Sequence, residues 1–446
     1  MIYLVQFGRN EDVEDCTGTL KNEWYYGFSN WKFERTARNP HPGLDENRYL
    51  NFVKKINLIS IEDFNKKTFF ENDIVILPFL NRQRLNREYE RIITQIKKYF
   101  NSTNLLRENT HLILGVSAES NGNRVEGQNG PHGGGLNNEQ AAEIVYKEVG
   151  KENQKVKLIV DGSVTWGRKK PTDGKPRLVS GSMFLEWAED LIVNHDSDSI
   201  FEENVRKIEN LEDRSKLFTC LQRRPRMCRF INLYNIKRYN LLDDGFVSLR
   251  LGTVQPAIGF KHSFKHDVQW KVESEDLMKT TKDFSKFLTE CKDRKNNHYT
   301  ADDIDLFTNQ ALQLTPHHYT DSYFHVAVET LVSPDIIFFT EKIYKPIICG
   351  SPFFVLGNRR MIKKLQEWGL KTFSDWWDES YDEDNSHWER SKKVFSIISD
   401  LKKKPKSELN LMLKEQLPIL KHNYNRIREV INEDNYLEEI INLIIK

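Results

Sequence analysis

Three consecutive residues that could bind a phosphorylated ligand follow a short apolar run in the last third of the chain. Thr340, Glu341 and Lys342 come directly after the apolar residues 336–339 and open a stretch with helical spacing that ends near Gly350. A helix that begins after a strand presents unpaired N–H groups and the positive end of its dipole, which together attract anions. Thr340 suits the N-cap position and Glu341 suits the first turn.

Lys342 is the residue that indicates a function. A cation in the first helical turn is mildly unfavourable unless a nearby anion balances its charge. The pattern therefore predicts that Lys342 contacts ligand phosphates while Glu341 accepts hydrogen bonds from ribose hydroxyls. The alternative is an ordinary capped helix with a solvated Glu-Lys pair, because such patterns are common. The residues alone leave both interpretations open.

The surrounding sequence resembles the donor-binding motif of the α1,3-fucosyltransferase family and its viral and bacterial relatives. The resemblance is carried by VET at 328–330, TEKIYKP at 340–346 and GSPFFVLGN at 350–358, within about residues 215 to 380. In that family the Glu and Lys of the motif hold the ribose and phosphates of a nucleotide sugar, which implies these roles for Glu341 and Lys342. It also implies that Glu329 lies near the donor sugar or base. Thr340 and Lys345 complete the donor-binding residues predicted from this motif.

A basic cluster lies where a strand is expected to end and a helix to begin. The segment CLQRRPRMCR at 220–229 carries four arginines, which repel one another unless they share an anion. The alternative is a solvated helix face. In the resembling family an Arg at this place contacts the donor pyrophosphate, which implies that role for Arg226 and Arg229, three apart on one helical face, and then for Arg223. This chain has QRRPR where relatives tend to have NGRPR.

The acceptor side offers three candidates for the base that an inverting sugar transfer requires. Glu119 follows the expected strand at 112–116 and opens the glycine-rich segment 120–137, Asp161 ends the next expected strand, and His132 lies within that segment. The base of the resembling family is likewise a Glu just after an N-terminal strand, and GVSAE at 115–119 is faintly similar to that place. Glu119 could instead cap the backbone of the loop.

The basic segment TWGRKKPTDGKPR at 165–177 also belongs to the acceptor side. Lys169 and Lys170 in it could contact an acidic acceptor, although most runs of this kind are solvated surface. A net charge of +1 offers nucleic acid no general attraction. We therefore expect a glycan acceptor first. A hydroxymethylated base in phage DNA comes second, prompted by a composition typical of AT-rich genomes.

Neither a metal nor another cofactor is expected beside the nucleotide-sugar co-substrate. The acidic residues at 302–303 and 382–384 lie in polar contexts away from strand ends, which predicts surface positions. Arginine, lysine and a helix dipole can balance the charge of a donor without a metal. The alternative function is a non-catalytic nucleotide-binding or assembly protein on the same fold.

The elements that must position these residues alternate along the chain. Apolar runs at 1–8, 73–78, 112–116, 156–160, 217–221, 245–249, 323–328 and 352–356 predict strands, and helical spacing at 84–100, 138–149, 226–239 and 361–368 predicts helices between them. The charged stretch from about 250 to 309 carries no predicted element. This alternation predicts the α/β class with parallel sheets.

The chain length predicts two domains. With 446 residues, we expect an acceptor-side domain at 1–200 and a donor-binding domain at 201–446 that ends in helices with core spacing at Ile427, Val430 and Ile431. Two Rossmann-like domains facing across a cleft, with C-terminal helices closing back, form the GT-B arrangement.

The sequence also carries expectations about the compartment. No apolar run approaches the roughly 20 residues that span a bilayer, and the N-terminus lacks a leader pattern. Five scattered cysteines argue against a disulfide framework or a zinc ribbon and predict reduced, mostly buried thiols. We therefore expect a cytoplasmic protein of a bacterium or a phage-infected cell.

Overall fold

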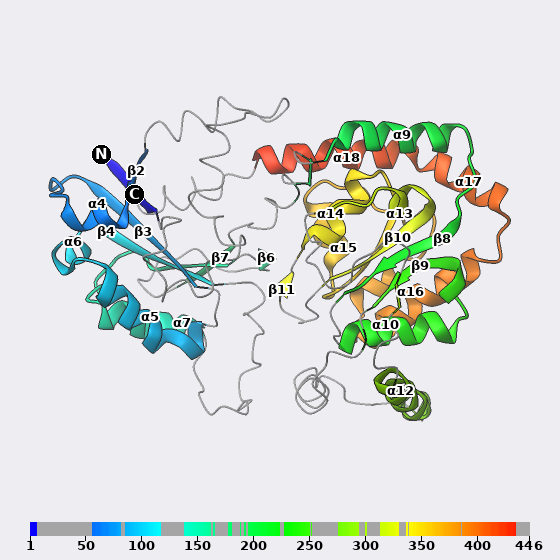
Figure 1. Cartoon of the computed structure of the whole chain (residues 1–446), viewed down its shortest axis with the longest axis horizontal. Coiled ribbons are helices and arrows are strands. Elements are labelled where there is room, and N and C mark those ends of the chain that lie inside the picture. The colour runs from blue at the N-terminus through cyan, green and yellow to red at the C-terminus, as the bar shows by residue number, and fades with distance from the viewer. Residues whose placement is uncertain are drawn as a thin grey trace. The chain divides into compact units, whose positions relative to one another are not determined.

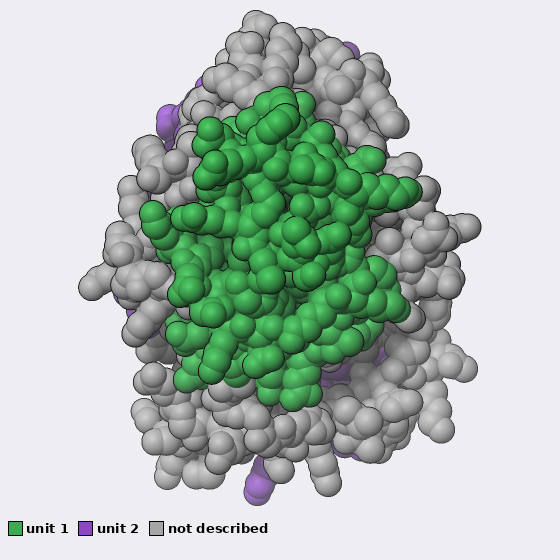
Figure 2. Space-filling model, turned by 90° about the vertical axis from the view of Figure 1, so that its left-hand side faces the viewer, with its two compact units in different colours: residues 1–186, 431–446 green, residues 187–430 purple. Residues whose placement is uncertain are grey.

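The computed structural model divides into two compact units (Figure 2), unit 1 with Met1–Glu186 and Ile431–Lys446, and unit 2 with Trp187–Val430. The sequence placed the division after residue 200. The structure describes residues 1–6, 56–81, 85–116, 138–161, 164–165, 177–180, 188, 191–192, 195–223, 227–249, 251, 275–293, 299–300, 313–329, 336–337, 339–384 and 386–433. Both units are α/β, with parallel sheets of the kind found in Rossmann-like folds.

Unit 1 is organised around a sheet with the strand order β2-β1-β3-β4-β5-β7, in which every pairing is parallel. Its elements are β1 (Ile2–Gln6), β2 (Ile56–Ser60), α4 (Ile61–Lys66), β3 (Ile74–Asn81), α5 (Leu85–Tyr99), α6 (Ser102–Leu106), β4 (Thr110–Val116), α7 (Asn138–Glu148), β5 (Leu158–Asp161), β6 (Val164–Thr165) and β7 (Arg177–Ser180). Crossovers between these strands bring their carboxyl ends to one edge.

The apolar run of β3 is buried on both faces of this sheet. Val75 and Leu77 point to one side and join a core cluster with Ile92 and Ile96 of α5. Ile76 lies between them on the opposite face and is equally buried. This explains why the strand is an unbroken apolar run and not an alternating one, as the sequence predicted.

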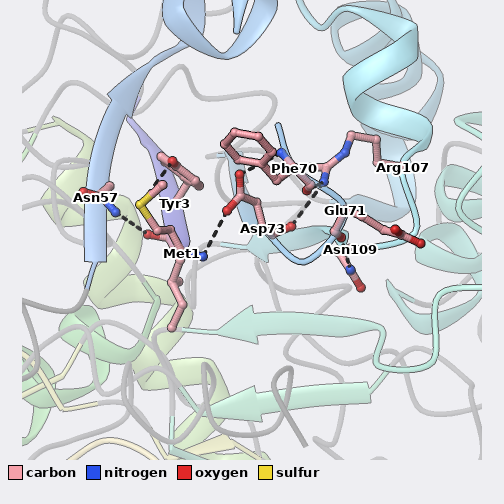
Figure 3. Close-up of polar contacts among 9 residues, drawn as sticks. Met1, Tyr3, Asn57, Phe70, Glu71, Asp73, Arg107 and Asn109 are labelled. Carbon is pink, nitrogen blue, oxygen red and sulfur yellow. Dashed lines mark hydrogen bonds and ion pairs between the residues drawn. The ribbon is translucent and has the colours of Figure 1, made fainter. Parts of the chain in front are cut away.

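The start of β1 is tied to the turn that precedes β3 (Figure 3). The amino group of Met1 lies 3.0 Å from Asp73 Oδ1, and Asp73 Oδ2 accepts a hydrogen bond from the Phe70 N–H at 2.9 Å. Arg107 Nη2 donates to the Phe70 carbonyl from the segment before β4. These contacts connect the beginnings of β1, β3 and β4 at the amino edge of the sheet.

Gln154 extends the backbone ladder of β4 with its side chain. Its Oε1 accepts from the Leu112 N–H at 2.9 Å, and its Nε2 donates to the Leu112 carbonyl at 3.0 Å and to the Val156 carbonyl at 2.6 Å. The backbone pairing of β4 with β5 begins only one residue later, at Ile113 and Leu158. The buried amide therefore satisfies polar groups that β5 does not reach.

Gln154→Leu should lower the free energy of unfolding by about 1 to 3 kcal/mol, because it leaves the buried Leu112 N–H without a partner, whereas the Leu112 carbonyl keeps the Tyr146 hydroxyl. Urea denaturation measures the change. The control is Asn109→Ala, which removes a single hydrogen bond to the Glu71 carbonyl at a partly exposed position. It should cost less than about 1 kcal/mol. Equal losses in both variants would contradict the assigned role of Gln154.

Unit 2 contains a second parallel sheet, with the strand order β12-β10-β8-β9. Its elements are α9 (Ser197–Glu209), β8 (Lys216–Leu221), α10 (Met227–Arg238), η4 (Leu242–Asp244), β9 (Gly245–Ser248), α12 (Glu275–Asp293), α13 (His317–Thr320), β10 (Ser322–Val328), β11 (Ile336–Ile337), α14 (Glu341–Ile348), β12 (Phe353–Leu356), α15 (Met361–Glu367), η5 (Ser380–Glu383), α16 (His387–Leu401), α17 (Lys406–Glu415) and α18 (Leu417–Glu433). Figure 1 shows α10 and α16 on one side of this sheet and α9 and α14 on the other.

Several sequence predictions for unit 2 are confirmed, and one region was missed. Strands β8, β9, β10 and β12 lie where apolar runs predicted them, and Ile427, Val430 and Ile431 of α18 are buried. The charged stretch without a predicted element contains α12, a helix of 19 residues whose inner side carries Phe284, Phe287 and other buried apolar residues at helical spacing.

Two further expectations can be compared with the structure. Cys220, Cys228, Cys291 and Cys349 are free and buried, as predicted, whereas Cys16 lies outside the described residues. Among the helices that the structure describes, none combines the length and apolar character that a membrane crossing requires.

Candidate functional site

The carboxyl edge of the unit 2 sheet collects buried polar side chains. Each strand ends at or just before such a residue, with exposed fractions of 2% or less: Ser248 for β9, Gln222 for β8, Glu329 for β10 and Asn358 for β12. Open parallel sheets bind ligands outside this edge. Burial of polar groups is costly unless they find partners, so this row of residues marks the candidate site.

Helix α14 begins beside this edge, and contacts fix both of its ends. Thr340 is its N-cap, and the hydroxyl accepts from the Lys342 N–H, as predicted from the sequence. At the other end, Gly350 adopts a positive φ of 66°, and a Cβ there would lie 2.8 Å from the Phe201 ring. Asn204 Nδ2 donates to the carbonyls of Cys349 and Gly350 at 2.8 and 2.9 Å. The first turn therefore has a defined position relative to β10.

The Thr340 hydroxyl connects the end of β10 to the charged residues of α14. Glu329 Oε1 accepts from the Thr340 N–H at 2.8 Å, and Glu329 Oε2 accepts from the Thr340 hydroxyl at 2.6 Å. Lys342 Nζ donates to the same hydroxyl oxygen at 2.8 Å and to Glu341 Oε1 at 2.8 Å. The ammonium also lies 3.9 Å from Glu329 Oε2. Glu329 thus pairs with Thr340 and Lys342.

These charges perturb one another because the site is buried. Burial raises the pKa of Glu329 to about 7, against the opposing effects of Lys342 and the Thr340 hydrogen bonds. Burial also acts to raise the pKa of Glu341, but Lys342 and Lys345 outweigh it and lower that pKa. Burial lowers the pKa of Lys345 to about 8 although Glu341 opposes it. Glu329, Glu341, Lys342 and Lys345 form a charged cluster. Its two carboxyl groups and two amines carry nearly equal and opposite charge.

Two of the predicted arginines reach the same edge. Arg223 follows Gln222 directly after β8, at the carboxyl edge of the sheet. Arg229, in the first turn of α10, is buried and lowers the pKa of Cys220 in β8 against the larger effect of burial. A solvated helix face is therefore the wrong interpretation for Arg229.

The remaining predicted residues lie in unit 1 or outside the described residues. Asp161 ends β5 at the carboxyl edge of the unit 1 sheet, where its backbone pairs with Ser180 of β7. Five predicted residues lie outside the described residues: Glu119, His132, Lys169, Lys170 and Arg226.

The prediction that the acidic segment at 382–384 lies on the surface is wrong for its first residue. Asp382 is buried, and its carboxylate accepts from the N–H groups of Met361 at 3.0 Å and Ile362 at 2.9 Å, at the start of α15. Burial raises the pKa of Asp382 to about 6 against these hydrogen bonds. Asp382 therefore supports the helix that follows β12, and no local pattern links it to a helix start about 20 residues earlier.

Sequence reasoning also missed four uncharged polar residues beside the site. Gln222 and Asn358 end strands, and Asn232 of α10 and His387 of α16 lie behind them, all buried. The only sequence signal was a polar residue directly after each apolar run. Over the part of the chain that can be described, no three His, Cys, Asp or Glu side chains cluster in a way that could hold a metal ion.

Comparison with known protein families gives no match for this chain, and comparison with curated proteins gives none either. A function can therefore be inferred only from the residues of the site and from the resemblance of its motif.

Glu329→Gln should remove part of the pH dependence of stability. The folded carboxyl keeps its proton up to a pKa of about 7, whereas the unfolded one loses it near 4.5. Its stabilising contribution is therefore complete below pH 4.5 and is lost as the pH rises to 7. Between pH 5 and 8 the wild type should lose about 1 to 3 kcal/mol relative to the variant in urea denaturation.

The control for this measurement is Glu367→Gln, which changes an exposed carboxylate paired with Lys364. Its stability should follow the wild-type pH profile. Parallel profiles for wild type and Glu329→Gln would contradict the raised pKa of Glu329.

Proposed function

We propose that this protein is a glycosyltransferase that moves a sugar from a nucleotide-sugar donor to an acceptor hydroxyl. The observation that carries the proposal is the Lys342 ammonium at the start of α14, next to the carboxyl end of β10. Its side chain is 18% exposed, and its present partners are the Thr340 hydroxyl and Glu341. A phosphate at this helix start would meet both an ammonium and the positive end of the helix dipole.

The neighbouring residues suit the rest of a nucleotide. Glu341 is held with Oε1 on Lys342, and its buried Oε2 has no hydrogen-bond partner among the described residues, so this oxygen can accept from a ribose hydroxyl. Arg223 and Arg229, together with Arg226, would add positive charge for a pyrophosphate. The Glu329, Glu341, Lys342 and Lys345 cluster is nearly neutral by itself, so the arginines would supply the excess charge that the donor requires.

We place the acceptor with unit 1, which makes the proposed arrangement GT-B. Glu119 or Asp161 would take the proton from the acceptor hydroxyl as the donor phosphate leaves. The preferred acceptor is a glycan, with a hydroxymethylated DNA base as the second class. The charge of the leaving nucleotide would be stabilised by Lys342, the arginines and the helix N-terminus, so the proposed transfer uses no metal.

Isothermal titration with UDP, GDP, CDP and dTDP tests the donor site. At least one of them should bind at or below millimolar concentration, and the matching nucleotide sugar should release nucleoside diphosphate slowly without an acceptor. Absence of binding across the panel would exclude the proposal. Binding without any turnover would favour the alternative, a nucleotide-binding or assembly protein without catalysis.

Lys342→Ala should raise the dissociation constant of the nucleoside diphosphate by about one to two orders of magnitude, since a charge-assisted phosphate contact contributes roughly 1.5 to 3 kcal/mol. Glu341→Ala should weaken binding of the diphosphate similarly, through the ribose. Titration calorimetry measures both.

The matched control for Lys342→Ala is Lys402→Ala. It removes an equal charge from an ion pair with Asp244, at the end of α16. Donor affinity should then stay within twofold of wild type. Unchanged affinity in both Lys342→Ala and Glu341→Ala would leave these residues with a helix-capping role alone.

A further inference from the structure

A chain of hydrogen bonds between uncharged side chains lies on the α10 and α16 side of the same sheet edge. Asn232 Nδ2 of α10 donates to Gln222 Oε1 at 3.3 Å. His387 Nε2, in the first turn of α16, lies 3.2 Å from Asn232 Oδ1 and 3.2 Å from the Cys228 carbonyl. All three side chains are buried.

One end of the Gln222 amide is left over at the end of this chain. Burial and the nearby Arg390 lower the pKa of His387 to about 3, so the ring is neutral and has one N–H. The carbonyls of Cys228 and Gly357 both act on this ring, and its tautomer decides whether Nε2 donates or accepts. With either tautomer, Asn232 turns one end of its amide to His387 and the other to Gln222. The far end of the Gln222 amide, Nε2 in the structure, has no partner among the described residues.

Asn358 provides a second amide of this kind. Its side chain is 2% exposed, and neither Oδ1 nor Nδ2 has a hydrogen-bond partner in the described part of the chain. The preceding residue cannot shift easily, because Arg390 Nη2 donates to the Gly357 carbonyl at 2.6 Å. A Cβ on Gly357 would lie 2.5 Å from Met361 Sδ and 3.0 Å from Glu329 Cβ. The backbone therefore holds the Asn358 amide inside the protein.

The two amides lie at the same carboxyl edge of the sheet. The register that pairs Lys216 with Ser322 aligns Gln222 with Val328 six residues later, and Val328 pairs with Leu356. Asn358 lies two residues beyond Leu356, in the bend that follows β12. The two strands flank β10, which separates the amides by about 10 Å across the sheet. That distance is too long for them to pair with each other.

We propose that Gln222 and Asn358 bind the uncharged portion of the ligand, a group with hydrogen-bond donors and acceptors at both ends. The free ends are the far end of the Gln222 amide and the complete amide of Asn358, beside a neutral histidine, so this subsite favours a neutral group and not an anion. The nucleoside or the sugar of a nucleotide sugar has this chemistry. Only the identity of the ligand rests on the proposed function.

Asn358→Leu tests the inference, because leucine has nearly the same shape and lacks the amide. If the amide serves a ligand, the free protein should gain thermal stability when an unpaired buried group is removed. Binding should weaken about fivefold or more. The control is Asn423→Leu, where an amide of equal burial donates to the Lys371 carbonyl and accepts from the Lys371 N–H, both at 2.8 Å. This control should lose stability and keep its affinity.

The probes are the four nucleoside diphosphates, UDP-glucose and GDP-mannose, the free nucleosides, and glucose and mannose, each titrated against wild type and both variants. A loss shared by nucleosides assigns the amide to the nucleoside, and a loss confined to probes with a sugar assigns it to the sugar. A change below fivefold for every probe, or lower stability of Asn358→Leu, overturns the inference.

Failure of the proposed function gives a different result. If diphosphates and nucleotide sugars do not bind wild type but a nucleoside or sugar does, and that binding is lost in Asn358→Leu, the amide subsite stands and the glycosyltransferase proposal falls. If diphosphates and nucleotide sugars both bind wild type and Asn358→Leu equally and their binding depends on Lys342, the proposed function stands and the amide subsite falls. Absence of binding by every probe excludes both.

Discussion

The Thr340 hydroxyl joins a strand end to a helix start by accepting from Lys342 Nζ and donating to Glu329 Oε2. A hydroxyl can do both at once, which neither an amide N–H nor a carboxylate can. Glu329 is fully buried, and without the two donors of Thr340 its charge would have only the more distant Lys342 ammonium. The hydroxyl and the backbone N–H of Thr340 together therefore hold the first turn of α14, and with it the charged half of the site, at the end of β10.

The same sheet edge has two chemically different sides. Glu329, Glu341, Lys342 and Lys345 form a charged cluster toward α14, whereas Gln222 and Asn232 with neutral His387 form an uncharged hydrogen-bonded chain toward α10 and α16. Alternation of side chains along parallel strands separates the two, since neighbouring residues point to opposite faces. A ligand with a charged end and a neutral end, such as a nucleotide sugar, matches this division.

Three side chains around the site provide hydrogen-bond partners for buried backbone groups. Asp382 satisfies the start of α15, Arg390 holds the Gly357 carbonyl, and Asn204 satisfies the end of α14. These groups find partners within unit 2. The unpaired amides of Gln222 and Asn358 differ from them, and native proteins retain few such groups without a functional reason.

The sequence alone determined the α/β class, most strands of the parallel sheets and the capped start of α14, because these depend on periodicity and on residues within a few positions of one another. It also pointed to Glu329 as the polar residue after a buried strand. It missed α12, although Phe284, Phe287, Leu288 and Cys291 carry the helical spacing, because charged residues dominate that segment. Only the tertiary structure decided that Asp382 is a helix cap, that Arg229 is buried, and that His387 fixes the amide chain from 155 residues beyond Asn232. Such hydrogen bonds form between residues that packing brings together. Local sequence patterns do not identify partners that are distant in the chain.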